Sequence, residues 1–254
     1  MGMTTIEQRR ATPLPPPKDL SHAQRVVPVA ECGEPLVPSS LYPSKILVRS
    51  WYFGENLAHS LPECYLREGA FERLTAAAEN LPEGWRFVVW DGWRPPKLQA
   101  RLFEILEGRI AKANPSLSPE EVRKETSVFV ALPSTEPMTV SGHCTGGAVD
   151  LTIADGKGRY LNMGGLFDDP TERSFSRHYE DLLGKNSSLT GEEREALGNR
   201  RLLISLMEEA GFSNYPEEWW HFDFGNRNWA LRTGAPEARY AFITPYAPWS
   251  EEQQ

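Results

Sequence analysis

The sequence predicts one α+β domain in which helices flank a central, largely antiparallel sheet. Short β-rich runs and amphipathic helical stretches alternate unevenly, unlike the regular β–α order of a parallel α/β fold. The 254 residues can bury a full core, and a content of 40% hydrophobic and 24% charged residues is ordinary for a globular protein. No internal repeat interrupts this pattern.

Residues 1–45 predict an extended, proline-rich arm on the surface. They show little hydrophobic periodicity, and PLPPP at 13–17 is typical of a polyproline conformation. We therefore assign the domain itself to residues 46–254.

The first half of the domain predicts a helix, a strand and two further helices. Apolar residues recur at helical spacing over 65–80, until LPEG ends that helix. RFVVW at 86–90 is a short β-rich run, closed by DGWRPP. The two prolines suit the first turn of the next helix, whose amphipathic stripe covers 97–113. SLSPEEVRKE at 116–125 has a serine N-cap and early acidic residues, which favour a short helix.

The second half predicts two strands separated by a long polar stretch and a helix. AVDLTI at 148–153 is the first strand, and 155–190 is loop with some helix. The clearest helix of the chain covers 192–212 and is closed by Gly211. WWHFDF at 219–224 is aromatic and β-like.

Charge and hydropathy argue against several classes of partner. The net charge of −8 disfavours nucleic acid and anionic membranes. No window approaches the ~18 consecutive apolar residues of a membrane-spanning helix. The N-terminus has no apolar segment after its two arginines, so it does not resemble a secretory signal. We therefore expect a cytoplasmic protein.

The three cysteines predict reduced thiols rather than a disulfide framework. Cys32, Cys64 and Cys144 are odd in number, and none forms a CxxC pair. Cys144 follows His143 and is a possible nucleophile, but small buried thiols are common, so we favour a structural thiol.

The stretch SGHCTGGAVD at 141–150 suggests two metal ligands. Its two adjacent glycines disfavour a helix and favour a loop that turns into a strand. In that strand Asp150 lies on the face opposite the apolar Val149 and Leu151, and the glycine turn can fold His143 back beside it. One imidazole and one carboxylate provide two of the three protein ligands that a catalytic zinc requires.

The stretch PEEWWHFDF at 216–224 offers the third ligand, His221, and a carboxylate nearby. Glu218 precedes His221 by three residues, so on a regular strand the two side chains would point to opposite faces. Both can reach one site if the chain bends near Glu218, which Pro216 allows. Glu217, four residues before His221, is the alternative if this segment is helical, and we favour Glu218.

These residues match the chemistry of zinc-dependent amide hydrolysis. Zinc lowers the pKa of bound water to about 7 and polarises a carbonyl. A carboxylate beside that water can move its proton, and a cation near the carbonyl oxygen stabilises the developing charge. Arg94 follows the strand end VVWDGW and is placed to be that cation. Alternatively, Arg94 forms a structural ion pair with Asp91.

The motifs SxHxxGxAxD, EWWH and DGWRP together resemble the zinc D-alanyl-D-alanine dipeptidase family. This family belongs to the D-Ala-D-Ala peptidases that share a fold with lysostaphin-type enzymes and the hedgehog domain. The resemblance covers about residues 45–225 and includes NRRLLISLMEEAGF and MGGLFD. The chain departs from the family pattern at Trp93, where tyrosine is usual, and at Cys144 after the histidine.

The resemblance implies one zinc ion per chain in a cleft, with defined roles for the residues around it. The implied zinc ligands are His143, Asp150 and His221, with Glu218 as general base and Arg94 steadying the tetrahedral intermediate. Asp168 matches the acid that holds the substrate's ammonium group, with Asp169 as the alternative, and Ser141 matches a serine that helps to bind the dipeptide.

The implied reaction is hydrolysis of D-Ala-D-Ala to two D-alanines. The partner would then be a small D,D-dipeptide, without nucleic acid or membrane, in glycopeptide resistance or in recycling of the peptidoglycan wall. Two alternatives stay open: a D-Ala-D-Ala carboxypeptidase of the same zinc group, and a zinc-bearing binding module without catalysis. The sequence gives no indication of an oligomeric state.

Overall fold

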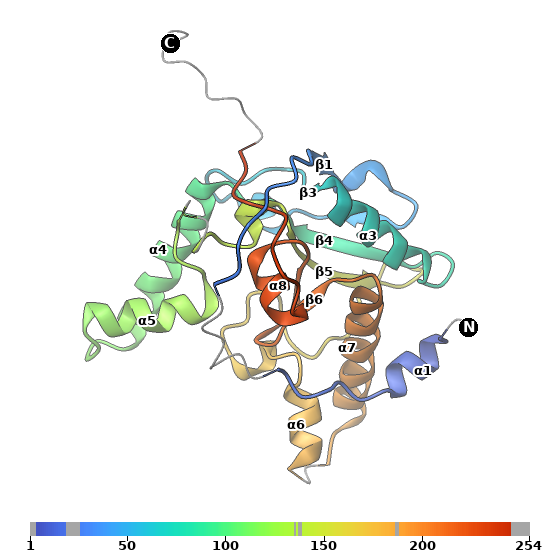
Figure 1. The fold of residues 1–254 in the computed structure, drawn as a ribbon. Helices are drawn as coiled ribbons and strands as arrows, with labels where there is room; N and C mark the ends of the chain where they lie inside the picture. The colour runs from blue at the N-terminus through green and yellow to red at the C-terminus, as the bar shows by residue number, and fades with distance from the viewer. Residues whose placement is uncertain (1–3, 19–25, 135, 137–138, 186–187, 245–254) are drawn as a thin grey trace.

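The computed structural model describes the chain except residues 1–3, 19–25, 135, 137–138, 186–187 and 245–254 (Figure 1). It confirms an α+β fold built around a five-stranded sheet of order β2-β4-β5-β7-β6, beside a small β1-β3 sheet. The strands are β1 Leu36–Pro38, β2 Ile46–Val48, β3 Tyr65–Arg67, β4 Arg86–Asp91, β5 Ala148–Ala154, β6 Ser213–Tyr215 and β7 Glu218–Asp223. The α-helices are α1 Ile6–Ala11, α2 Trp51–Gly54, α3 Glu68–Glu79, α4 Pro96–Ala113, α5 Pro119–Phe129, α6 His178–Gly184, α7 Gly191–Glu209 and α8 Arg227–Thr233.

The main sheet is largely antiparallel, as the sequence predicts. Strand β2 pairs with β4 in parallel, whereas the β4–β5, β5–β7 and β6–β7 pairs are antiparallel. A register shift after Val89 brings Asp91 opposite Asp150, and Asp150 in turn lies opposite His221. Paired residues on neighbouring strands point to the same face. Three polar side chains therefore line up across the centre of the sheet.

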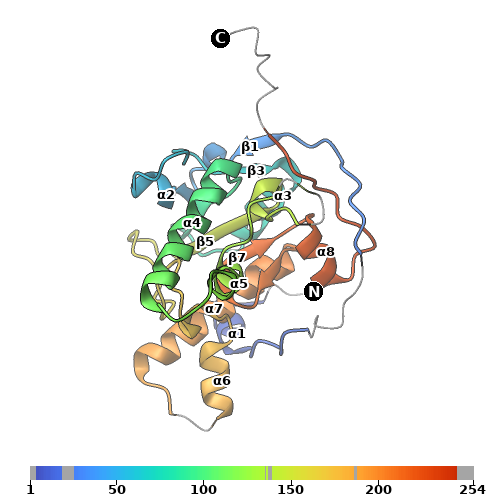
Figure 2. The ribbon, with the colours of Figure 1, turned by 90° about the vertical axis from the view of Figure 1, so that its left-hand side faces the viewer.

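The helices cover the sheet unequally. Helices α3 and α7 contact each other and pack buried side chains such as Leu74 and Leu203 into the main core. Figure 1 shows the α4–α5 hairpin on the other side of the molecule. In Figure 2, which views that side, α4 and α5 lie in front of β5 and β7. No described helix has both the length and the apolar character needed to cross a membrane.

Local signals explain where the long helices begin and end. Helix α7 starts with a capping box between Thr190 and Glu193, and Gly211 follows its end with φ +94°. Helix α5 starts with the same motif between its N-cap Ser118 and Glu121, and it carries Pro119 in its first turn.

Two expectations from the sequence are wrong in detail. The helix predicted from residue 65 begins only at Glu68, because Tyr65–Arg67 pair with Leu36–Pro38 as strand β3. The N-terminal arm is not extended throughout, since α1 is closed by a capping box and packs on α7. Its Arg9 is 3% exposed and bonds both carboxylate oxygens of Glu209, at 2.5 and 2.6 Å.

Candidate active site

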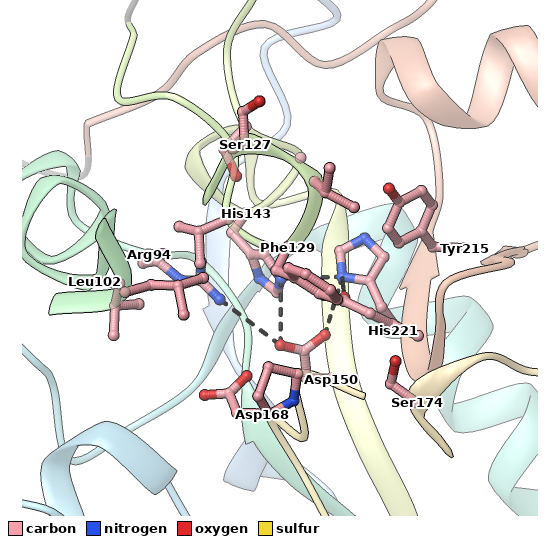
Figure 3. A pocket seen from close by; sticks show the side chains of 18 of the residues that line it. Arg94, Leu102, Ser127, Phe129, His143, Asp150, Asp168, Ser174, Tyr215 and His221 are labelled. Carbon is pink, nitrogen blue, oxygen red and sulfur yellow. Dashed lines mark hydrogen bonds and ion pairs between the residues drawn. The ribbon is translucent and has the colours of Figure 1, made fainter. Parts of the chain in front are cut away.

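Three candidate metal ligands converge on one point of the sheet. The ligand atoms of His143, Asp150 and His221 all lie within 4.8 Å of one another, and each residue is at most 8% exposed. Asp150 and His221 come from the paired strands β5 and β7, and His143 comes from the short 3₁₀ turn before β5. Gly146, with φ +72°, makes the reversal that brings His143 back to Asp150. Figure 3 shows the Asp150 carboxylate facing both imidazoles.

The hydrogen bonds behind the two imidazoles favour a cation between them. His143 Nδ1 lies 2.8 Å from the carbonyl oxygen of Gly92, and His221 Nε2 lies 3.3 Å from Asp223 Oδ2. These partners accept protons, so each neutral ring would turn a lone pair towards the other. The facing nitrogens, His143 Nε2 and His221 Nδ1, are only 3.1 Å apart. Two lone pairs and a carboxylate in such proximity fit a metal ion.

Contacts among these residues shift the pKa values of Asp150 and His221. Although burial opposes its ionisation, His143 and His221 hold the pKa of Asp150 well below its usual range. Burial likewise opposes the charge of His221, but Asp223 and Asp150 raise its pKa to about 10. Since a metal binds only the neutral imidazole, metal and proton compete for this site.

Glu218 faces the same site because β7 is interrupted by a bulge. Tyr215 pairs with Glu218 and Asn214 with Phe222, so three residues of β7 lie between consecutive pairs. The Asn214 amide donates to the carbonyl oxygens of both Glu218 and His221, at 3.0 Å each. This is the bend that the sequence requires near Glu218.

The bulge places the Glu218 carboxyl beside His221. Glu218 Oε2 lies 3.7 Å from His221 Nδ1, and burial raises the pKa of Glu218 to about 8, against the opposing effect of His221. Glu217 is not among the described residues that line the cleft, whereas Glu218 is. The Glu218 carboxyl group, which lines the cleft beside His221, is thus suited to proton transfer near neutral pH.

Arg94 forms the ion pair with Asp91 that the sequence offered as an alternative, and it also reaches the site. Its Nε donates to Asp91 at 2.8 Å and its Nη1 to Gln99 at 2.8 Å, while Nη2 lies 3.7 Å from Asp150 Oδ2. Burial disfavours its charge, but Asp91 holds the pKa of Arg94 above its usual range. The structural ion pair therefore fixes a permanent cation beside the three ligands.

The two expected substrate-binding residues also line the cleft. Ser141 lies just before the turn that carries His143 and is 6% exposed. Asp168 is partly exposed and accepts a hydrogen bond from Tyr52 at 2.9 Å, and enclosure in the cleft raises its pKa to about 6. Asp169 lines the cleft too, but its carboxylate accepts from the Thr171 amide. Both carboxylates therefore lie in the cleft, and each accepts one hydrogen bond.

The opposite wall of the cleft was not expected from the sequence. The cleft has a volume of about 790 Å³, and half-buried or exposed side chains of α4 and α5 form this wall. They include Leu102, Leu106, Val128 and Phe129. Figure 3 shows Leu102 near Arg94 and Tyr215 beside His221. The periodicity of α4 predicts an apolar face, but not that part of it faces a cleft.

Cys144 is not a plausible nucleophile in this arrangement. It is 1% exposed, and burial raises the pKa of its thiol to about 11. A protonated, enclosed thiol is a poor nucleophile. Sequence reasoning missed Tyr52, for which no local signal exists, and Asp223, which the two-residue spacing from His221 could have revealed.

Comparisons with known proteins point to one family. The model of the D-ala-D-ala dipeptidase family matches residues 63–237, which include every candidate site residue. A D-alanyl-D-alanine dipeptidase of Synechocystis sp. is 31% identical over 215 residues, covering 80% of this chain and 87% of the relative. The dipeptidase of Escherichia coli is 30% identical over 164 residues, or 63% and 66% of the two chains. That of Enterococcus faecium is 29% identical over 147 residues, or 55% and 62%.

Proposed function

The chain belongs to the D-ala-D-ala dipeptidase family of metallopeptidases, and from this premise we propose that it hydrolyses D-Ala-D-Ala with zinc held by His143, Asp150 and His221. The observation that carries the proposal is the convergence of two imidazole nitrogens and a carboxylate within 4.8 Å, in a cleft that also holds Glu218. Three such ligands with one side open to the cleft are typical of a catalytic zinc site. When bound, zinc supplies a Lewis acid that polarises the scissile carbonyl and makes water acidic enough to attack, with a pKa of about 7.

Glu218 is the proposed general base. With a pKa of about 8 it can accept the proton of the attacking water and release it to the leaving amine near neutral pH. Its place beside His221 Nδ1, at 3.7 Å, supports this assignment.

Arg94 is the proposed stabiliser of the developing negative charge. Two of its nitrogens are fixed on Asp91 and Gln99, which leaves Nη2 near the ligands. A preorganised donor of this kind contributes about 3 kcal/mol to the transition state.

Asp168 is the proposed anchor for the free ammonium group of the dipeptide, and Ser141 a further hydrogen-bonding group for it. A negative carboxylate at this edge of the cleft favours substrates that end in a free amine next to the scissile bond. This is why a dipeptidase suits the site better than a carboxypeptidase acting on longer peptides.

The test is release of D-alanine from D-Ala-D-Ala by the zinc-loaded protein, with Glu218→Ala and L-Ala-L-Ala as controls. We expect release that requires Glu218 and spares the L,L substrate. Cleavage of longer D,D-peptides without cleavage of the dipeptide would replace the proposal with the carboxypeptidase. Stoichiometric zinc without hydrolysis of any D,D-peptide would replace it with a binding module.

A further inference from the structure

Arg200 of α7 is a buried guanidinium that binds the main chain rather than a carboxylate. Its side chain is 0% exposed, and it donates to the carbonyl oxygens of Met163, Arg173 and Phe175 at 2.7, 2.6 and 2.6 Å. No carboxylate of the described residues lies within ion-pair distance of it, although Asp169 is near enough to favour its charge. Burying a charge without a counter-ion is costly, and charge-assisted hydrogen bonds offset that cost. Burial lowers the pKa of Arg200 to about 10, so the group stays charged at neutral pH.

The three carbonyls close one loop, residues 163–175. Met163 begins the loop, and Arg173 and Phe175 end it, so one planar group holds both of its ends. Gly165 permits this approach, because a Cβ atom there would lie 3.0 Å from Arg173 O and 3.4 Å from Arg200 Nη2. The neck of the 163–175 loop is therefore built around the Arg200 side chain.

The 163–175 loop carries Asp168, the proposed ammonium anchor. Asp168 has φ +57°, a left-handed conformation that disfavours most residues and is retained where the surroundings impose it. Its neighbour Phe167 is 6% exposed and packs against Trp90 at a centroid distance of 4.9 Å. Figure 3 shows Asp168 and Ser174 of this loop along one edge of the cleft. The position of the Asp168 carboxylate therefore depends on contacts made by its neighbours, such as those of Phe167.

The end of the same loop is tied to the hairpin that carries Glu218. Ser176 follows the loop; its amide donates to Pro216 O at 2.9 Å and its hydroxyl to Asn214 Oδ1 at 2.5 Å. Asn214 in turn donates to the carbonyl oxygen of Glu218 at 3.0 Å. Arg200 thus binds the end of the loop that connects Asp168, the proposed ammonium anchor, to the hairpin of Glu218, the proposed base.

We propose that Arg200 is a positioning residue that sets the distance between Asp168 and Glu218. Arg200 would thereby select substrates whose free amine lies one residue from the scissile bond. This selectivity rests on the proposed function. Arg200 touches no substrate and acts only through the 163–175 loop.

The test compares Arg200→Lys with Arg201→Lys, a matched change at the next position of α7. Lysine keeps the charge but loses the planar fork that spans three carbonyls. Arg201 instead pairs with Glu180 of α6, at 2.7 Å, and leaves the loop untouched. Misplacing a binding group by about 1 Å is costly, so we expect Arg200→Lys to raise KM for D-Ala-D-Ala about tenfold with kcat within about threefold. Arg201→Lys should change both constants less than twofold.

Two further variants separate positioning from a general loss of structure. Gly165→Ala presses on the same neck from the loop side and should reproduce the rise in KM, even if Arg200→Lys folds poorly. In an Asp168→Asn background, Arg200→Lys should raise KM no further, because its effect passes through Asp168. If Arg200→Lys and Asp168→Asn raise KM by independent factors that multiply, or if Arg200→Lys lowers kcat alone, the inference is wrong.

Hydrogen exchange distinguishes failure of this inference from failure of the proposed function. Arg200→Lys should speed exchange of the amides in 163–175 and leave those of β5 unchanged, whatever the enzyme hydrolyses. Exchange at wild-type rates would refute the role of Arg200 at the neck. An inactive wild type, or an Asp168→Asn variant with unaltered KM, would instead refute the proposed function, and with it the claim about substrate selection.

Discussion

The two walls of the cleft are built in different ways. On the sheet wall, His143, Asp150 and His221 are almost completely buried, and each imidazole is held from behind by a second partner. On the helix wall, the side chains of α4 and α5 that line the cleft are half-buried or exposed, and Val128 is 48% exposed. Among the described residues, no hydrogen bond joins a side chain of these helices to the three ligands.

The sheet wall carries the residues proposed for the chemistry, whereas the helix wall shapes the cleft. A metal site needs fixed distances, and the paired central strands and the turn before β5 supply them. An apolar helix surface instead excludes water and sets the width of the cleft, and it can change without moving the ligands. We therefore expect substitutions on the sheet wall to have large effects and those on the helix wall to have small ones.

Removing the metal should have the largest effect on the sheet wall. Chelation should abolish hydrolysis, and added zinc should restore it. A ligand that binds only the folded state stabilises it by about 4 kcal/mol when the ligand concentration is about a thousand times Kd. The melting temperature should therefore rise when zinc is added. Calorimetry with and without zinc measures this. Full activity and equal melting after exhaustive chelation would remove the metal from the proposal.

Replacing Arg94 should lower kcat strongly while zinc stays bound. Arg94→Gln removes a fixed cation beside the ligands, for which a loss of about 10²- to 10³-fold in kcat is typical. The measurement is kcat together with the zinc content of the purified variant. A loss of zinc that matches the loss of activity would instead make Arg94 a support of Asp150.

Replacing Asp223 tests whether the sheet wall depends on its rear contacts. Asp223 is fully buried and approaches His221 Nε2 at 3.3 Å, and it also pairs with Arg232 at 2.5 Å. Asp223→Asn should weaken zinc binding by about 10- to 100-fold, because such partners orient the ligating ring. Competition with a chelating dye gives the affinity. Unchanged affinity with reduced kcat would contradict this role.

Sequence patterns predict the sheet wall much better than the helix wall. Strand alternation and the glycine turn place Asp150 and His143 together, and the odd spacing of Glu218 and His221 requires the bend that β7 contains. Those signals are local. The position of the Arg94 cation is also local, since Arg94 lies three residues after its partner Asp91, the last residue of β4.

The rest depends on contacts between distant segments. Strands β2 and β6 have three residues each, too few to show a period. The bond between Tyr52 and Asp168 joins residues that are 116 positions apart, and one sequence gives no sign of it. Helix periodicity likewise identifies an apolar face but not the surface that it covers.

The charge of Asp168 should give a smaller, pH-dependent effect on stability. Enclosure raises the pKa of Asp168 from 3.8 to about 6, so the folded state binds more protons than the unfolded state between these values. Ionised Asp168 therefore destabilises the metal-free protein above pH 6 and not below about pH 4. Asp168→Asn should raise stability at pH 7.5 by about 1 kcal/mol or less, since the group is partly exposed. Equal differences in melting temperature at pH 4 and 7.5 would exclude this charge effect.

The smallest effect is expected on the helix wall, where Leu106→Ala can be compared with Leu151→Ala. Both changes delete the same atoms, but Leu151 is 0% exposed next to Asp150, whereas Leu106 is half-buried at the cleft. Leu151→Ala should cost about 2–5 kcal/mol of unfolding free energy, as buried leucines do. Leu106→Ala should cost less than about 1 kcal/mol, because much of its surface already meets water.

The kcat of Leu106→Ala for D-Ala-D-Ala should stay within about threefold of wild type, since a uniform loss of apolar contact affects KM rather than kcat. A large fall in kcat for Leu106→Ala would mean that the helix wall also positions the reacting groups, and that the two walls are not independent.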